Sequence, residues 1–282
     1  MVRHSPELGQ SKVAKRRDWI FLYETSADRN VLEAKTANGI IRGILDHVSS
    51  GDTFAIIAVS TRPKVYGGGF QSVSPGNRAG ISSFLNGLPK LGALNLEQGF
   101  AEASRLAGTV KNPVIVHLGS GIPVLGERNT AALLNLLPDA PFVGVGVGPR
   151  WNRPLMKYAA AKTGGFFTEV NPDEPARWRA FDLLSTLNAP RLIGVEVTAP
   201  NTGFKFHTFK DTLAHGEELC AIAKLPAHAP APTQIAVHGF VDGDEWHQVV
   251  NVSSPKSSAR YLAAHIVAGA VLKSVLNAGR WG

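Results

Sequence analysis

The chain has 282 residues, of which 44% are hydrophobic and 18% charged, and its net charge is +7 at pH 7. This composition excludes an intrinsically disordered chain and is typical of a globular protein that buries a core. The single cysteine, Cys220, excludes an intramolecular disulfide framework. The positive charge is scattered, apart from the cluster "KVAKRRD" at residues 12–18, and no nucleic-acid-binding motif follows it. We therefore expect a solvated basic surface and no nucleic-acid partner.

Both ends of the chain bear on its location in the cell. Residues 1–17 form a polar, basic lead-in that lacks the apolar core of a secretory signal, so we expect the chain as given to be cytoplasmic, or exported if its natural N-terminus lies further upstream. The apolar segment at residues 261–279 contains His265 and Lys273 and is rich in Ala and Val. We therefore predict a C-terminal helix over residues 255–282 and no membrane span.

Residues 18–188 alternate short apolar runs with helical patterns. The helical stretches begin with capping pairs, Asn30 with Glu33 and Asn95 with Gln98. Gly39 and Gly43 lie inside the first helical stretch, where we expect them to allow close packing on a sheet. Nearly continuous apolar runs are typical of strands that are covered on both faces. The pattern predicts an α/β domain with a doubly wound, mostly parallel sheet flanked by helices, with strands at 19–23, 54–59, 113–118, 141–147 and 165–170.

The pattern changes after a last helical stretch at residues 172–188. Residues 189–254 contain short strand-like runs that are separated by Pro, Gly, Asn and Asp. This spacing predicts a small antiparallel β-rich domain that forms part of a sandwich.

Several catalytic motifs are incomplete. The nine histidines show no zinc-binding spacing, and "HLGSGIP" at 117–123 lacks the outer glycine of a nucleophile elbow. "GVGVGPRWN" at 144–152 does not complete the dinucleotide-binding pattern, because Pro149 replaces the glycine that would begin a helix. We therefore predict that the protein is not an enzyme.

Polar side chains nevertheless gather where strands of the predicted sheet end. Glu24, Ser26 and Asp28 follow the first strand, Asn95 precedes a helix, and Ser120 follows a central strand. The carboxyl ends of parallel strands face one crevice, where ligands usually bind. We predict that these five residues line a crevice that binds a ligand or partner.

These motifs resemble those of a von Willebrand factor A domain over residues 18–170. "ETSAD" at 24–28, "GALN" at 92–95 and "GSG" at 119–121 occupy the places of that family's three metal-binding loops, and "SSGDTFAIIAVS", "NLEQGFAEA" and "VIVHLGSGIPVLGE" match flanking segments. The resemblance implies a protein-interaction module. The β-rich tail, with "FKDTLAHGEELCAIAKL", resembles the segment that follows this domain in proteins similar to inter-alpha-trypsin inhibitor heavy chains.

The loops depart from the family's metal-binding pattern. Glu24 stands for Asp, Asp28 for Ser, Leu94 for Thr and Ser120 for Asp, whereas Ser26 is retained. Leu94 cannot bind a cation, and Glu24 extends its carboxylate by about 1.5 Å, which the octahedral geometry of Mg²⁺ does not easily absorb. We predict no cofactor and a degenerate metal site, although a loose Ca²⁺ or Mg²⁺ at the remnant Glu24, Ser26 and Asp28 stays open.

In this interpretation Ser26 and Asp28 cap the following helix and Glu24 is solvated. The expected partner is another protein, which binds without a metal ion. The alternative is an enzyme or sensor that binds a nucleotide or phosphate in the same crevice, with the backbone amides of "GSG" as its cradle.

Overall fold

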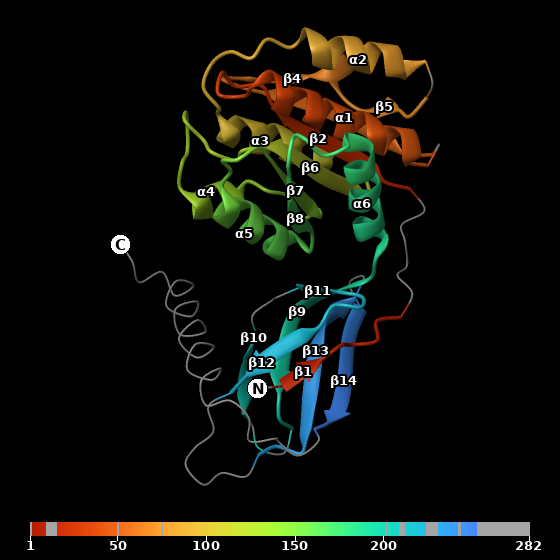
Figure 1. Ribbon diagram of the computed structural model, residues 1–282, viewed down its shortest axis with the longest axis vertical. Helices are drawn as coiled ribbons and strands as arrows, with labels where there is room; N and C mark the ends of the chain where they lie inside the picture. The colour runs from red at the N-terminus through yellow and green to blue at the C-terminus, as the bar shows by residue number, and fades with distance from the viewer. Residues whose placement is uncertain are drawn as a thin grey trace. The chain divides into compact units, whose positions relative to one another are not determined.

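The computed structural model describes residues 2–9, 16–49, 51–74, 76–200, 202, 204–208, 212–223, 231–241 and 244–252. The chain divides into two compact units (Figure 1). The α/β unit comprises Val13–Asn188, and the β unit comprises Met1–Lys12 together with Ala189–Gly282. The C-terminal helix predicted over residues 255–282 lies outside the described residues.

The α/β unit is built on a mixed sheet. Its five longer strands are parallel neighbours, as predicted, but β4 and β5 pair antiparallel with β3. These two short strands follow β3 directly and cover its free edge. The strand order is β4-β3-β2-β6-β7-β8, with β5 beside β3. The bounds are β2 (Asp18–Glu24), β3 (Thr53–Val59), β4 (Pro63–Val65), β5 (Gln71–Ser72), β6 (Pro113–Gly119), β7 (Phe142–Val147) and β8 (Phe166–Val170).

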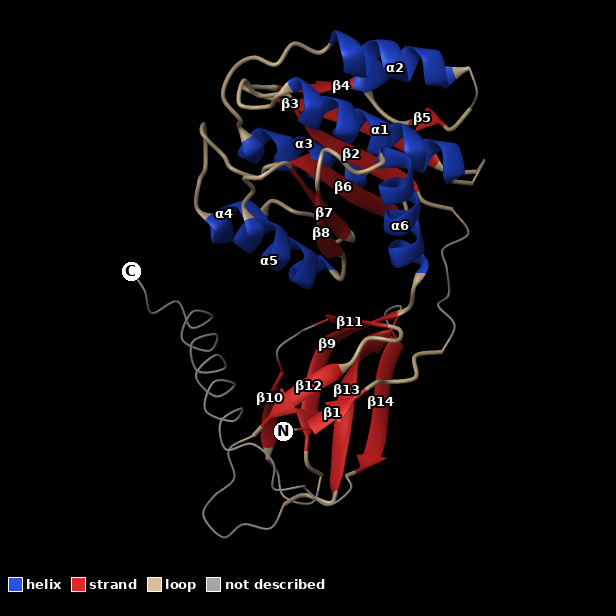
Figure 2. Cartoon of the chain, viewed as in Figure 1, coloured by secondary structure: helices blue, strands red, loops and turns tan. Residues whose placement is uncertain are grey.

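Helices cover both faces of this sheet (Figure 2). Apolar side chains of α1, α2 and α6 pack in one hydrophobic cluster with one face of the strands, and those of α3, α4 and α5 pack in a second cluster on the other face. All seven residues of β2 are therefore buried. The bounds are α1 (Val31–His47), α2 (Asn77–Gly87), α3 (Leu96–Ala107), α4 (Thr130–Asn135), α5 (Arg153–Thr163) and α6 (Ala176–Asn188), with a short 3-10 turn at Tyr66–Gly68.

The glycines of α1 pack on a helix and not on the sheet, so that part of the prediction is wrong. A Cβ atom added to Gly39 would lie 2.7 Å from Cβ of Ala176, and one added to Gly43 would lie 2.7 Å from Cβ of Ala180. Real Cβ atoms do not approach so closely. Because both glycines lack a side chain, α1 and α6 can pack backbone to backbone on the same face of the sheet.

The β unit is a sheet in which every pair of neighbouring strands is antiparallel, as predicted. Side chains from both ends of the strand order meet in one hydrophobic cluster, which includes Leu219, Ala221, Leu192, Ile235 and Val237. The order is β1-β12-β10-β9-β13-β14, with β11 beside β9. The bounds are β1 (Val2–His4), β9 (Arg191–Thr198), β10 (Lys205–Thr208), β11 (Thr212–Ala214), β12 (Leu219–Ile222), β13 (Gln234–Val241) and β14 (Asp244–Asn251).

Strand β1 lies inside the stretch that was predicted to be a basic lead-in, so it was not expected. Val2–His4 pairs with β12 from the other end of the chain. A three-residue strand carries too little periodicity to be recognised without its partner. As for the membrane, none of the helices in the described part of the chain combines the length and hydropathy that a span requires.

Candidate binding crevice

Three loops of the α/β unit meet at the carboxyl edge of the parallel strands. The Ala27 amide donates a hydrogen bond to the Gly92 carbonyl (2.9 Å), and the Val124 amide donates to the Leu94 carbonyl (2.9 Å). The loops after β2, before α3 and after β6 are thereby joined. They bound a crevice of about 460 Å³, which is lined by Ala27, Asp28, Arg29, Glu33, Gly92, Ala93, Leu94, Ile122, Val124, Pro149 and Arg150.

Glu24 lies beneath this crevice and is only 1% exposed, so the prediction that it is solvated is wrong. Its Oε1 accepts hydrogen bonds from Nε2 of His117 (2.9 Å) and from the Gly121 amide (2.7 Å). Its Oε2 accepts from the amide (2.7 Å) and the hydroxyl (2.9 Å) of Ser120. A carboxylate has about four lone-pair positions. All of them are used by the protein itself.

The extra methylene of Glu24 explains this arrangement, because it carries the carboxylate from the end of β2 across to the loop after β6. A Cβ atom added to Gly119 would lie 2.2 Å from Cδ of Glu24, so this close approach requires glycine. Gly121 has a φ of +64°, a conformation that glycine adopts without strain. The two outer residues of "GSG" therefore accommodate Glu24.

His117 is the partner that the sequence analysis missed. Its ring is fully buried beside the rings of Phe100 and Phe142, at centroid distances of 6.3 and 5.9 Å. We place its proton on Nε2, because this nitrogen contacts the carboxylate of Glu24. Within an apolar strand, one histidine does not reveal whether it faces the core or a loop. Its alignment with Glu24 across two neighbouring strands becomes visible only in the sheet.

The surroundings of Glu24 favour its ionised form. Burial by itself would raise the pKa of this carboxyl. The hydrogen bond from His117, the Ser120 amide and the charge of Arg29 outweigh burial, so the pKa of Glu24 is lowered from its ordinary value of 4.5. Glu24 therefore contributes stability that is present above pH 4.5 and is lost as the pH falls through its folded-state pKa.

Ser26 and Asp28 do not cap the following helix. The hydroxyl of Ser26 donates to Oδ1 of Asp28 (2.5 Å), and Ser26 is 1% exposed. The cap of α1 is Asn30, whose side chain accepts from the Glu33 amide while the Glu33 carboxylate accepts from the Asn30 amide. Asn30 directly precedes the helix, so it takes the cap position, and Ser26 and Asp28 lie too far upstream.

Arg29 supplies a fixed positive charge to the crevice, which the sequence analysis also missed. Its side chain is only 8% exposed and lies 3.0 Å from Oδ2 of Asp28 and 3.5 Å from Oε2 of Glu33. It also donates to the carbonyl of Val147 (3.2 Å). Burial would raise the pKa of Asp28, but Ser26 and Arg29 lower it overall.

The remaining predicted site residues serve the fold. Asn95 caps α3 by accepting from the Gln98 amide (3.2 Å) and is 6% exposed. Ser120 is fully buried against Glu24. Leu94 is 1% exposed and packs in the hydrophobic cluster beneath α3. Of the five residues predicted to line the crevice, only Asp28 does so.

Large apolar side chains are exposed around the crevice. Val124 is 51% exposed and lines the crevice. Leu91 is 65% exposed and directly precedes Gly92, which also lines the crevice. Leu125, which follows Val124, and Val31 and Leu32, which precede Glu33, are also exposed. We call these five side chains the apolar rim.

Among the described residues, no group of three or more His, Cys, Asp or Glu side chains is arranged to hold a metal ion. No protein-family model matches the sequence, and no curated protein matches it.

Solved structures do resemble this chain. A von Willebrand factor type A protein from Catenulispora acidiphila aligns with a TM-score of 0.56 and 13% identity, over 84% of this chain and 65% of that one. Proximal thread matrix protein 1 from the mussel byssus gives 0.49 and 16% identity over 61% and 46%, and the ArnB paralog VWA2 from Sulfolobus acidocaldarius gives 0.45 and 14% over 88% and 67%.

The likeness to the Catenulispora protein shows a fold of the von Willebrand factor A type, and at such low identity it shows the fold alone. The chain spans less than two thirds of that protein. The resemblance of the β-rich tail to inter-alpha-trypsin inhibitor heavy chains stays a prediction, as does the location in the cell.

Proposed function

We propose that the protein is a non-catalytic protein-interaction module whose crevice binds a partner protein without a metal ion. The observation that carries the proposal is the state of Glu24. Each of its two oxygens accepts two hydrogen bonds from the chain, so a cation would have to displace His117 and the third loop. Mg²⁺ and Ca²⁺ need several free oxygen donors. The donor atoms present here do not fit that need.

Charge balance supports metal independence as well. Asp28 and Glu33, the carboxylates that line the crevice, both lie beside the buried guanidinium of Arg29. A positive charge belonging to the chain therefore stands where a bound cation would otherwise be needed to neutralise them.

The apolar rim supports a protein as the partner. Exposed apolar side chains that gather beside a cleft mark interaction sites, whereas isolated ones need no explanation. Val124 lines the crevice, and Leu91 directly precedes Gly92, which lines it from another loop, so a partner side chain seated there would bury apolar area contributed by both loops.

A nucleotide or phosphate ligand is less well supported. The amides of Ser120 and Gly121, which would cradle a phosphate, already donate to Glu24 at 2.7 Å. A phosphate would have to compete with a buried carboxylate for both donors.

The proposal predicts that charge placed on the apolar rim abolishes partner capture. The double variant Leu91→Glu/Val124→Glu would lose bound partner at least tenfold in quantitative affinity capture, because binding would then bury carboxylates. Tyr158→Glu on α5, an exposed position of the same unit outside the apolar rim, should bind like the wild type. Chelation of divalent ions by EDTA should leave capture unchanged. Capture that needs Mg²⁺ or Ca²⁺, or that survives the double variant, would contradict the proposal.

A further inference from the structure

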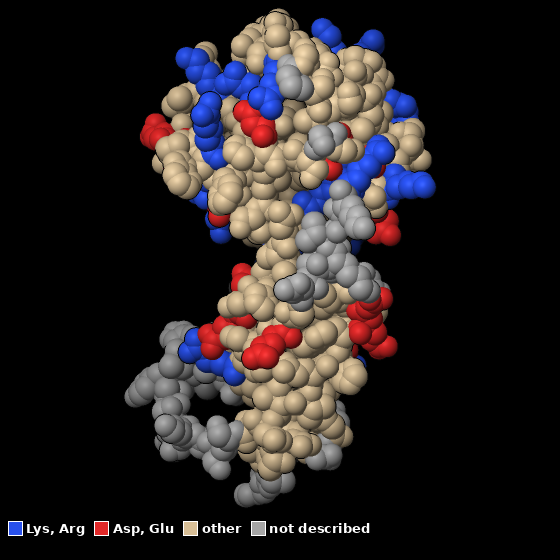
Figure 3. All heavy atoms as spheres, turned by 90° about the vertical axis from the view of Figure 1, so that its right-hand side faces the viewer, with Lys and Arg blue, Asp and Glu red and all other residues tan. Residues whose placement is uncertain are grey.

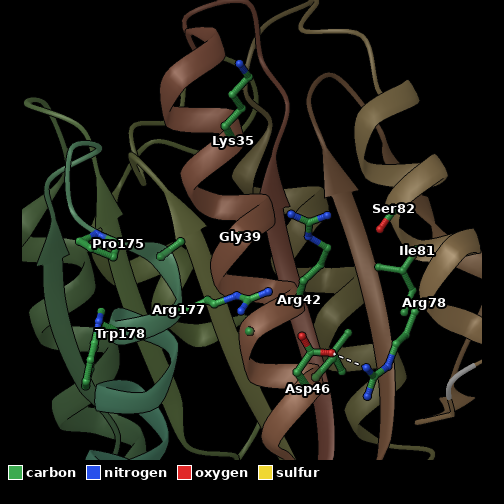
Figure 4. Close-up of a pocket in the computed structure, with 13 residues that line it drawn as sticks. Lys35, Gly39, Arg42, Asp46, Arg78, Ile81, Ser82, Pro175, Arg177 and Trp178 are labelled. Carbon is green, nitrogen blue, oxygen red and sulfur yellow. Dashed lines mark ion pairs between the residues drawn. The ribbon is translucent and has the colours of Figure 1, made fainter.

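A second concave surface lies among the helices that cover one face of the sheet in the α/β unit, α1, α2 and α6. It is a groove of about 630 Å³ between α1, α2 and α6 (Figure 4). It is lined by Lys35, Gly39, Arg42, Gly43, Leu45, Asp46, Arg78, Ile81, Ser82, Pro175, Ala176, Arg177 and Trp178. We call it the helical groove.

The helical groove is strongly basic. Lys35 and Arg42 come from α1, and Arg177 comes from α6 and points toward Arg42 (Figure 4). In the part of the chain that the structure describes, none of these three side chains has an ion-pair partner. The one carboxylate of the groove, Asp46, lies 3.1 Å from Arg78 of α2. Like charges that share one cleft repel each other, so an anion bound between them would be favoured.

The two glycines of α1 give the groove its shape. Lys35, Gly39, Arg42, Gly43 and Asp46 follow one stripe of the helix. Gly39 and Gly43 carry no side chain and let α6 approach α1 closely, so backbone lines the groove between the charged residues. Lys35 and Arg42 are seven residues apart, or about 10 Å along the axis. The positive charges are therefore spread along a line.

The end of the groove at α6 adds a positive helix terminus and an aromatic side chain. Residues 176–178 are the first of α6 and line the groove, so the positive end of the helix macrodipole lies there. Trp178 is 72% exposed, and Phe181, one turn later, is 57% exposed. More widely, Lys and Arg outnumber Asp and Glu on the visible face of the α/β unit (Figure 3).

We propose that the helical groove binds an acidic segment of a partner polypeptide, in which carboxylates alternate with apolar side chains. The spread of charge fits several carboxylates along a chain better than one small anion, which an enclosed pocket would bury. Leu45 and Ile81 line the groove but are only 5% and 3% exposed, so its apolar surface comes chiefly from the 72% exposed ring of Trp178, against which an apolar side chain of a polypeptide can pack. This surface is separate from the crevice, so the inference goes beyond the proposed function.

The test is fluorescence anisotropy of labelled hexaglutamate with the full-length protein. We expect saturable binding that weakens at physiological ionic strength, where the Debye length is about 8 Å. Arg42→Glu/Arg177→Glu should weaken binding at least tenfold. Lys157→Glu, an exposed position on α5 across the sheet, makes the same charge change for one residue and should have less than a twofold effect. Leu91→Glu/Val124→Glu on the apolar rim should also leave hexaglutamate binding unchanged.

Other results would overturn the inference. Absence of saturable binding would do so, and so would equal weakening by Lys157→Glu, which would indicate unspecific attraction. Tighter binding of oligothymidylate with the same loss in the double variant would assign the groove to nucleic acid, and displacement by inorganic phosphate at equal charge would assign it to a small anion. If the double variant does not fold, as judged by circular dichroism, Arg42→Gln and Arg177→Gln singly replace it, and each should weaken binding at least threefold.

Discussion

Replacing Glu24 with Gln is expected to destabilise the α/β unit by about 1–3 kcal/mol, the cost of leaving a buried hydrogen-bond donor without an acceptor. The Gln side chain fits the space, but its amide group cannot accept hydrogen bonds as both carboxylate oxygens do now. At least one of the amides of Ser120 and Gly121, or the His117 ring, would then be buried without an acceptor. For a unit of this size the melting temperature should fall by roughly 5 °C.

Urea unfolding followed by far-ultraviolet circular dichroism measures this loss, because all helices in the described part of the chain belong to the α/β unit. Glu102→Gln on α3 is the matched control, since it removes a surface pair with Arg105 that contributes less than about 0.5 kcal/mol. The pKa of Glu24 is lowered in the folded state, so the difference between wild type and Glu24→Gln should narrow below about pH 4.5. Equal stability of the two proteins at pH 7 would show that Glu24 is not buried as described.

Replacing Gly43 with Leu is expected to destabilise the same unit by about 1–3 kcal/mol. Even the first atom of the new side chain would lie 2.7 Å from Cβ of Ala180, which has no flexible end that could move away. The two helices must separate, and the apolar contacts of α6 with the sheet must loosen.

The matched control is Gly87→Leu at the end of α2, where an added Cβ atom would meet nothing within 4 Å. It should change the free energy of unfolding by less than about 0.5 kcal/mol. Thermal unfolding of the three proteins compares them directly. A Gly43→Leu protein as stable as the wild type would mean that α1 and α6 do not pack backbone to backbone.

The parts of the fold that follow from local pattern could be predicted from the sequence. The apolar runs of β2 and β6 predict buried parallel strands, and Asn30 and Asn95 cap the helices that the pattern assigns to them. Such features depend on residues that are neighbours along the chain. The short edge strand β4 and the strand β1 carry too few residues to show a period.

The candidate site was harder to predict, because its contacts join distant segments. The length of Glu24 suggested a carboxylate pushed outward toward solvent, whereas the structure turns it inward to His117, which is 93 residues away in the sequence. Gly39 and Gly43 indicated close packing, but not that the neighbour would be α6. The apolar rim is invisible in the sequence, because Leu91 and Val124 look like core residues until the loops are placed.

Calorimetric titration of the wild-type protein with Mg²⁺, Ca²⁺ and Mn²⁺ tests the central claim, that the crevice works without a metal ion, most directly. The oxygens of Glu24 are fully used within the chain, and Asp28 is paired with Arg29. We therefore predict no saturable heat of binding for any of the three cations at millimolar concentration. A dissociation constant at or below about 0.1 mM, which corresponds to roughly −5.5 kcal/mol, would contradict the account.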